Sequence, residues 1–190
     1  MKWQIVQASG YFPVKTNLGV VILASSGKNE IIIDLVREGV QALVLGIVKS
    51  KKSDNLELKV TTIHQKPNTH AETMIHGLVT DQAQVQIKGL IQIKKSAQRV
   101  TDFLTERVLL LSDESRAIAE PELEIEADEV RASHAATVSS LDKDELFYLM
   151  SRGVTRVQAE QLIVSGFINQ VLLRIDDVKI RQQVNDYVKR

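Results

Sequence analysis

The residues of this chain best suited to chemistry are its four histidines, since it contains no cysteine. Imidazole binds zinc and iron and exchanges protons near neutral pH. His64, His70 and His76 follow one another at intervals of six residues, which matches neither a helical pair four apart nor a strand pair two apart. Neighbouring strands could still gather these three around a metal, but turn or surface histidines are the simpler interpretation, because segment 67–70 is turn-like.

The fourth histidine, His134, closes the last predicted strand among small residues that leave its ring accessible. Ser133 and His134 are adjacent, so a strand directs them to opposite faces and they cannot form a nucleophile–base pair. The sequence has no glycine-rich phosphate loop, no Gly-x-Ser-x-Gly and no His-Glu-x-x-His, the patterns typical of several enzyme classes. The residues alone therefore predict no enzyme.

Composition narrows the remaining classes. The 190 residues carry 24 Lys and Arg against 24 Asp and Glu, whereas a nucleic-acid binder needs a basic surplus. No apolar run approaches the roughly 20 residues of a membrane-spanning helix. Without cysteine the chain has no thiol nucleophile and no Cys-held metal or iron–sulfur cluster. We therefore expect a cytoplasmic protein that binds neither membranes nor nucleic acids.

The positioning elements are mostly short strands up to residue 140. Alternating β-branched runs predict them at residues 31–35, 42–48, 56–64, 72–79, 83–87, 90–94, 108–111, 122–126 and 129–133. Segment 98–107 could form one helical turn. Sandwich, barrel and β-helix folds all suit this pattern, and no strict repeat is visible. The wealth of Val, Ile and Leu, which stack as aliphatic ladders, favours a parallel β-helix.

From residue 141 helical patterns replace the strands. Asp142 can cap a first helix that Gly153 ends, and Thr155 with Gln158 can form a capping box for a second. The expected apolar face of the second helix comprises Val157, Leu162, Ile163 and Phe167, and residues 177–188 form a third amphipathic stretch. We predict two domains: a β core over residues 1–140 and a helical domain over residues 141–190.

Charge is locally segregated, because residues 113–129 contain eight acidic residues and one basic residue, just after Lys88, Lys94, Lys95 and Arg99. A solvated sheet face explains this pattern simply. Complementary patches used in docking are the alternative.

Several blocks of the sequence together resemble the C-terminal core of the SufB/SufD family, the scaffold subunits of the Suf system for iron–sulfur cluster assembly. The resemblance runs from about residue 61 to residue 175. The matching blocks, in order, are residues 97–98, 109–112, 121–125, 127–130, 133–137 and 146–153.

This resemblance implies a mainly β fold: a right-handed parallel β-helix followed by a small α-helical C-terminal domain. It implies pairing with a SufB-like subunit or with a second copy as a homodimer. It also implies docking of a SufC-type ATPase by the helical tail, with candidate residues Leu146, Phe147, Tyr148, Met150 and Arg152. Nascent iron–sulfur clusters would form transiently at the subunit interface.

Residue by residue, His134 falls on the family's Ser-His-Gly-Ala-Thr histidine, which is implicated in iron–sulfur cluster assembly. Glu106 falls where SufB-type members have their important cysteine, and Ala132 stands where many members have another. Ala135 replaces the usual glycine. Because carboxylate and imidazole are poorer ligands than thiolate for iron–sulfide clusters, we expect no stable cofactor and no resident metal on this chain alone.

The leading interpretation is a SufD-like, non-catalytic component of the assembly system. The missing cysteines instead favour a stand-alone interaction module derived from the family. A β-helix enzyme acting on polysaccharides has only the fold analogy and exposed carboxylates in its support.

Overall fold

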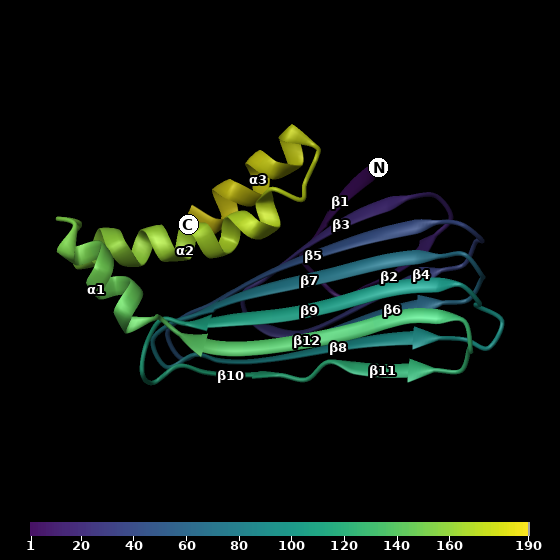
Figure 1. Cartoon of the computed structure of the whole chain (residues 1–190), viewed down its shortest axis with the longest axis horizontal. Coiled ribbons are helices and arrows are strands. Elements are labelled where there is room, and N and C mark those ends of the chain that lie inside the picture. The colour runs from purple at the N-terminus through teal and green to yellow at the C-terminus, as the bar shows by residue number, and fades with distance from the viewer. Residues whose placement is uncertain (190) are drawn as a thin grey trace.

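The computed structural model describes residues 1–189, and over these it contains twelve strands followed by three helices (Figure 1). The strands are β1 (Lys2–Val6), β2 (Gly10–Val14), β3 (Leu18–Ala24), β4 (Gly27–Leu35), β5 (Gln41–Ser50), β6 (Asn55–His64), β7 (His70–Val79), β8 (Gln84–Ile93), β9 (Val100–Leu110), β10 (Arg116–Ala119), β11 (Glu122–Ile125) and β12 (Val130–Ser140). The helices are α1 (Lys143–Ser151), α2 (Arg156–Leu172) and α3 (Val178–Lys189).

Every strand pairing is parallel, and the strands alternate between two sheets. Sheet A has the order β1-β3-β5-β7-β9-β12, and sheet B has the order β10-β8-β6-β4-β2, with β11 also pairing with β8. Successive coils therefore stack as a β-solenoid of about four turns. The predicted fold class, a parallel β-helix followed by helices, is confirmed.

Coil length explains why no repeat is visible in the sequence. Val44 pairs with Thr73, 29 residues later, and Ala71 pairs with Asp102, 31 residues later. Lys2 pairs with Leu18, only 16 residues later. The coils thus lengthen along the chain, and the first is the shortest, so no fixed period exists to be found.

The corners of the coils share a backbone conformation rather than a residue type. Gly39, Asn68 and Arg99 all have positive φ, at 72°, 58° and 57°. The backbone N–H of each donates to a carbonyl of the next coil, on Pro67, Gln98 and Glu129 respectively. Equivalent corners are therefore built from glycine, asparagine and arginine, which hides the repeat in the sequence.

Two apolar layers hold the molecule together. One fills the solenoid between the sheets, with Val44, Ile33 and Leu58 completely buried. The other lies between the outer face of sheet A and helices α2 and α3, where Leu45 and Ile47 meet Val171. Figure 1 shows these helices lying over sheet A alone. The helical segment therefore shares a core with the β segment, and β12 ends at Ser140, two residues before the N-cap of α1.

The predicted helix boundaries are confirmed by capping contacts. The Asp142 side chain accepts from the backbone N–H groups of Asp144 and Glu145. Thr155 and Gln158 form the reciprocal capping box. Gly153, with φ +87°, follows the C-cap of α1. Over residues 1–189, no helix is long and apolar enough to cross a membrane.

Three sequence expectations are wrong. Segment 98–107 contains the first part of strand β9 rather than a helical turn, because its β-branched residues pair with β7 and β12. The runs 83–87 and 90–94 form one strand, β8, continuous through Gly89. On α2, Val157 and Leu162 are exposed, and Ile168, Val171 and Leu172 bury instead because only this later part of the helix lies on the sheet.

Candidate functional site

The last coil leaves the solenoid interior open to solvent. We call β10, β11 and β12 together the terminal rung. Leu123 and Ile125 pair with the buried Ile91 and Ile93, and Val138 pairs with the buried Val108, so all three side chains face the interior. They are nevertheless 36%, 41% and 40% exposed. Inward-facing apolar side chains are thus uncovered at this end of the molecule.

His134 lies in the middle of this open end. On β12 it is in register with Leu104 of β9, which is buried in the interior. His134 therefore faces the inner side of sheet A, yet it remains exposed because no further coil covers it. Ser133, its neighbour, faces outward, as the sequence predicted from strand geometry.

Glu106 lies one rung deeper, on the same inner face as His134. It is in register with Ala136 of β12 and is completely buried. Its carboxyl reaches across the interior to Gly89 of β8, where a Cβ atom would lie 2.5 Å from Oε1. Neither carboxyl oxygen has a hydrogen-bond partner within the chain. Burial raises the pKa of Glu106 to about 7, and the charge of Glu120 adds to this effect.

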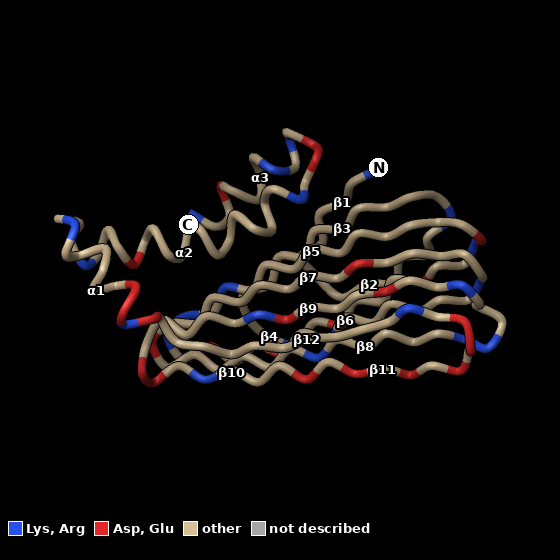
Figure 2. Tube along the Cα trace, viewed as in Figure 1, with Lys and Arg blue, Asp and Glu red and all other residues tan. Residues whose placement is uncertain are grey.

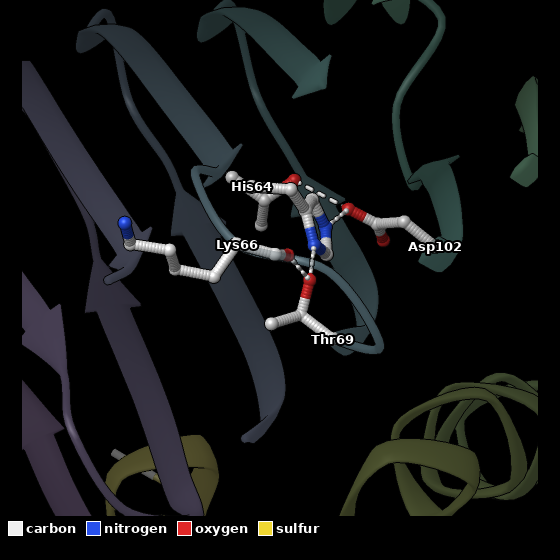
Figure 3. Close-up of polar contacts among 5 residues, drawn as sticks. His64, Lys66, Thr69 and Asp102 are labelled. Carbon is white, nitrogen blue, oxygen red and sulfur yellow. Dashed lines mark hydrogen bonds and ion pairs between the residues drawn. The ribbon is translucent and has the colours of Figure 1, made fainter. Parts of the chain in front are cut away.

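Ala132, the other position where the sequence lacks a family cysteine, is also on this face and pairs with Asp102. Asp102 belongs to a buried polar network shown in Figure 3. His64 Nε2 lies 3.0 Å from Asp102 Oδ2, and His64 Nδ1 lies 2.7 Å from Thr69 Oγ1. The Thr62 hydroxyl donates to the same Asp102 oxygen, and the Thr69 hydroxyl donates to the Lys66 carbonyl.

This network ties β6, the β6–β7 turn and β9 together inside the solenoid. Since Thr69 uses its own proton on the Lys66 carbonyl, it must accept from His64 Nδ1–H. Sequence reasoning missed the network because His64 and Asp102 are 38 residues apart. Only the coil register brings them into contact.

The three evenly spaced histidines do not form a common site. His64 is inside the solenoid, whereas His76 lies on the outer face of sheet A against Phe167. His70, at the start of β7, shares the outer face with His76 but is six residues away along the strand. Within residues 1–189, no three His, Asp or Glu side chains meet as a set able to hold a metal ion.

Helix α1 presents an aromatic and apolar surface. Phe147, Tyr148 and Met150 are 73%, 56% and 45% exposed, and the Arg152 guanidinium lies 5.2 Å from the Tyr148 ring centroid. Leu146, the fifth docking candidate, is buried, where α1 packs on α2. Leu146 therefore anchors α1 within this chain and is not available to a partner.

Acidic side chains line the outer side of β10 and β11, visible as a red run in Figure 2. Lys88 Nζ lies 3.2 Å from Glu120 and Lys94 Nζ lies 3.5 Å from Glu126, both across the pairing with β8. Gln92 donates to Glu124 in the same way. The basic residues upstream in the sequence thus meet the acidic segment within this chain.

The comparisons with known proteins place this arrangement. The family described as SUF system FeS cluster assembly, SufBD core domain, matches residues 17–167. The chain belongs to the SufBD family. The match begins well upstream of residue 61, where the sequence resemblance fades, and it contains every element from β3 to α1.

Individual SufBD relatives agree. The chain is 30% identical over 142 residues to the iron-sulfur cluster assembly protein SufD of Bacillus subtilis, covering 75% of this chain and 32% of that protein. It is 29% identical over 133 residues to SufD of Escherichia coli, covering 70% and 31%. A SufBD family protein of Synechocystis is 33% identical over 138 residues, covering 67% and 30%. The chain thus spans about a third of the length of these relatives.

Proposed function

We propose that this chain is a SufD-like, non-catalytic component of iron–sulfur cluster assembly. It pairs with another SufBD subunit through the open end of its solenoid and docks a SufC-type ATPase through α1. The observation that carries the proposal is the placement of His134, exposed on the inner face of the terminal rung of a SufBD core.

The edge of sheet A suits pairing with a partner strand. β12 is eleven residues long, contains no proline and carries one charged residue, Arg131, apart from the histidine. The edge of sheet B differs, because Pro121 interrupts it between β10 and β11 and glutamates line it. Proline and charge disfavour strand addition at a sheet edge. The partner strand therefore adds to β12, which brings a partner residue beside His134.

The ligand chemistry also calls for a partner. His134 offers an imidazole, and Glu106 lies on the same face one rung deeper. Both are harder ligands than the thiolates that hold iron–sulfur clusters, and the chain has no cysteine. The nascent iron–sulfur cluster, as cargo, therefore takes its thiolates from a cysteine-bearing SufB-like subunit, while His134 completes its coordination. A homodimer of this chain would lack thiolates.

Helix α1 provides the docking surface for the ATPase. Phe147, Tyr148 and Met150 form an exposed apolar group, and Arg152 lies beside it over the Tyr148 ring. Large exposed aromatic residues with an arginine are typical of the centres of protein interfaces. The parts of α1 that stabilise this chain, such as Leu146, face α2 instead.

The deciding experiment co-expresses this chain with a cysteine-bearing SufB-like subunit and a SufC-type ATPase. We expect both to co-purify, and we expect His134→Ala to lower the yield of iron–sulfur cluster, read by visible absorption, about tenfold. Ser133→Ala is the matched control, since it changes the adjacent exposed residue on the opposite face. Equal yields for the two variants would leave His134 without this role.

The competing function is a stand-alone interaction module, favoured by the absence of cysteine. It predicts that neither the SufB-like subunit nor the ATPase co-purifies with the chain. The same co-expression therefore separates the two proposals.

A further inference from the structure

Helix α2 is anchored to the solenoid over its later part only. Ile168, Val171 and Leu172 are buried in the layer against sheet A. In the first part of the helix, Val157 and Leu162 are 63% and 54% exposed. Figure 1 shows α1 and the start of α2 projecting beyond the ends of the strands. Since α1 packs on α2, the two form an arm that extends from an anchored base.

Phe167 lies where the anchored part of α2 begins. The His76 ring of β7 stacks on the Phe167 ring, with centroids 4.4 Å apart and planes inclined by 25°. The Arg107 guanidinium of β9 lies 5.6 Å from the same ring centroid. We call Phe167, His76 and Arg107 the Phe167 clamp. It joins α2 to two neighbouring strands of sheet A.

Two hydrogen bonds fix the orientation of the clamp. His76 Nδ1 lies 2.9 Å from the Phe167 carbonyl oxygen, to which it donates, and Arg107 Nη1 donates to Gln170 at 2.8 Å. His76 is completely buried, and its Nε2 has no partner. Burial lowers the pKa of His76 to about 4, so the stacked ring is neutral at physiological pH and Arg107 supplies the only positive charge of the clamp.

Beyond the clamp, the arm has room to move. A groove of about 590 Å³ lies between the arm and the outer face of β9 and β12, lined by Leu149 and Leu162 on one side and by Leu109, Ser139 and Ser140 on the other. A Cβ atom added to Gly166, just before the clamp, would meet no atom within 4 Å. Apart from the clamp, few contacts hold the arm against these two strands.

We propose that the Phe167 clamp is the fulcrum of this arm and fixes the position of α1 relative to β9 and β12. Arg107 is adjacent to Glu106 on β9 and in register with Thr137 on β12. A protein bound to α1 therefore acts through Phe167 and Arg107 on the strands that carry Glu106 and His134. This coupling rests on the proposed docking of an ATPase on α1, whereas the clamp is a property of the chain alone.

The absence of cysteine allows a direct test. Spin labels on Phe147→Cys in α1 and Ser133→Cys in β12 report the distance between the arm and the terminal rung. We expect one narrow distance distribution for the otherwise unchanged chain. Phe167→Ala should lose that single narrow distribution, and Phe167→Leu, which keeps an apolar side chain and protects against misfolding, should broaden it. Leu173→Ala, an exposed site on the same helix, should leave it narrow.

A distribution as narrow in both Phe167 variants as in the control would overturn the clamp. The coupling is tested in the complex with a SufC-type ATPase and a SufB-like subunit. There Phe167→Leu should retain ATPase capture but lower the yield of iron–sulfur cluster severalfold relative to Leu173→Ala, and equal yields would refute the coupling. If the unaltered chain captures no ATPase, the proposed function fails, while the spin-label distances still decide whether the clamp exists.

Discussion

His134 and Glu106 lie on the same inner face of neighbouring parallel strands, two register positions apart, yet one is exposed and the other is completely buried. This contrast follows from the solenoid, because β9 is covered by a further strand and β12 is not. A partner strand added to β12 would convert the His134 environment into one like that of Glu106. Pairing would thus desolvate the imidazole and the Glu106 carboxyl together, in a medium where each needs a ligand or a proton.

Glu106→Gln should stabilise the chain above pH 7. Since burial raises the pKa of Glu106 from 4.5 to about 7, the folded chain binds more protons than the unfolded chain between these values. Stability is therefore lost as the pH rises through this window, by about 2 kcal/mol. The free-energy difference between variant and parent, from urea unfolding at several pH values, should grow from acid to neutral pH and then level off. A difference that does not change with pH would contradict the burial of an ionisable carboxyl.

Gly89→Ala should destabilise the solenoid, by about 2 kcal/mol. The added Cβ would lie 2.5 Å from Glu106 Oε1 and 2.5 Å from Leu104 Cδ2, so both side chains must shift in a filled interior. Gly166→Ala is the matched control, because its Cβ meets open space within a helix and alanine there should gain up to about 1 kcal/mol. Thermal unfolding of the two variants should therefore shift in opposite directions. A shift in the same direction would mean that the interior around Gly89 is looser than the structure indicates.

Local patterns predicted the strands and the helix caps but not their spatial order. The alternation of Glu122–Ile125 and the capping box of Thr155 with Gln158 are properties of a few consecutive residues. The coil corners are not, because Gly39, Asn68 and Arg99 share a backbone angle rather than a chemical signature. The first strands were missed for a related reason, since β1 and β2 are five residues each and β2 contains Pro13.

The candidate site was likewise only partly visible in the sequence. His134 could be placed on the final strand by its small neighbours and by the family motif. The burial of Glu106 could not be predicted, because a helical turn was expected there and because its surroundings come from Gly89 on the opposite sheet. The Phe167 clamp depends on contacts between residues 91 positions apart, which no local spacing encodes.

His76→Asn should remove a dependence of stability on acid pH. Burial holds the pKa of His76 at about 4, below its ordinary 6.5, so the unfolded chain binds more protons in this window and stability falls as the pH drops from about 6.5 to about 4. The contribution is about 3 kcal/mol. Glu106 acts in the opposite direction over an overlapping window, so the effect should be read as the difference between parent and variant. A constant difference from pH 7 to pH 4 would show that His76 is solvated.

Removing either member of the buried pair His64 and Asp102 should cost more than most substitutions in this chain. Both side chains are completely buried, and Asp102 Oδ2 receives the Thr62 hydroxyl as well as facing His64 Nε2. Asp102→Asn and His64→Ala should each destabilise by about 3 kcal/mol, because each leaves the remaining member without its partner. The double variant should cost little more than either single one, since the penalty for an unpaired buried group is incurred only once. Asp128→Asn, an exposed carboxylate near the same end, should stay within about 0.5 kcal/mol. Fully additive costs in urea unfolding would mean that His64 and Asp102 stabilise the solenoid independently, and that the three-strand network does not act as a unit.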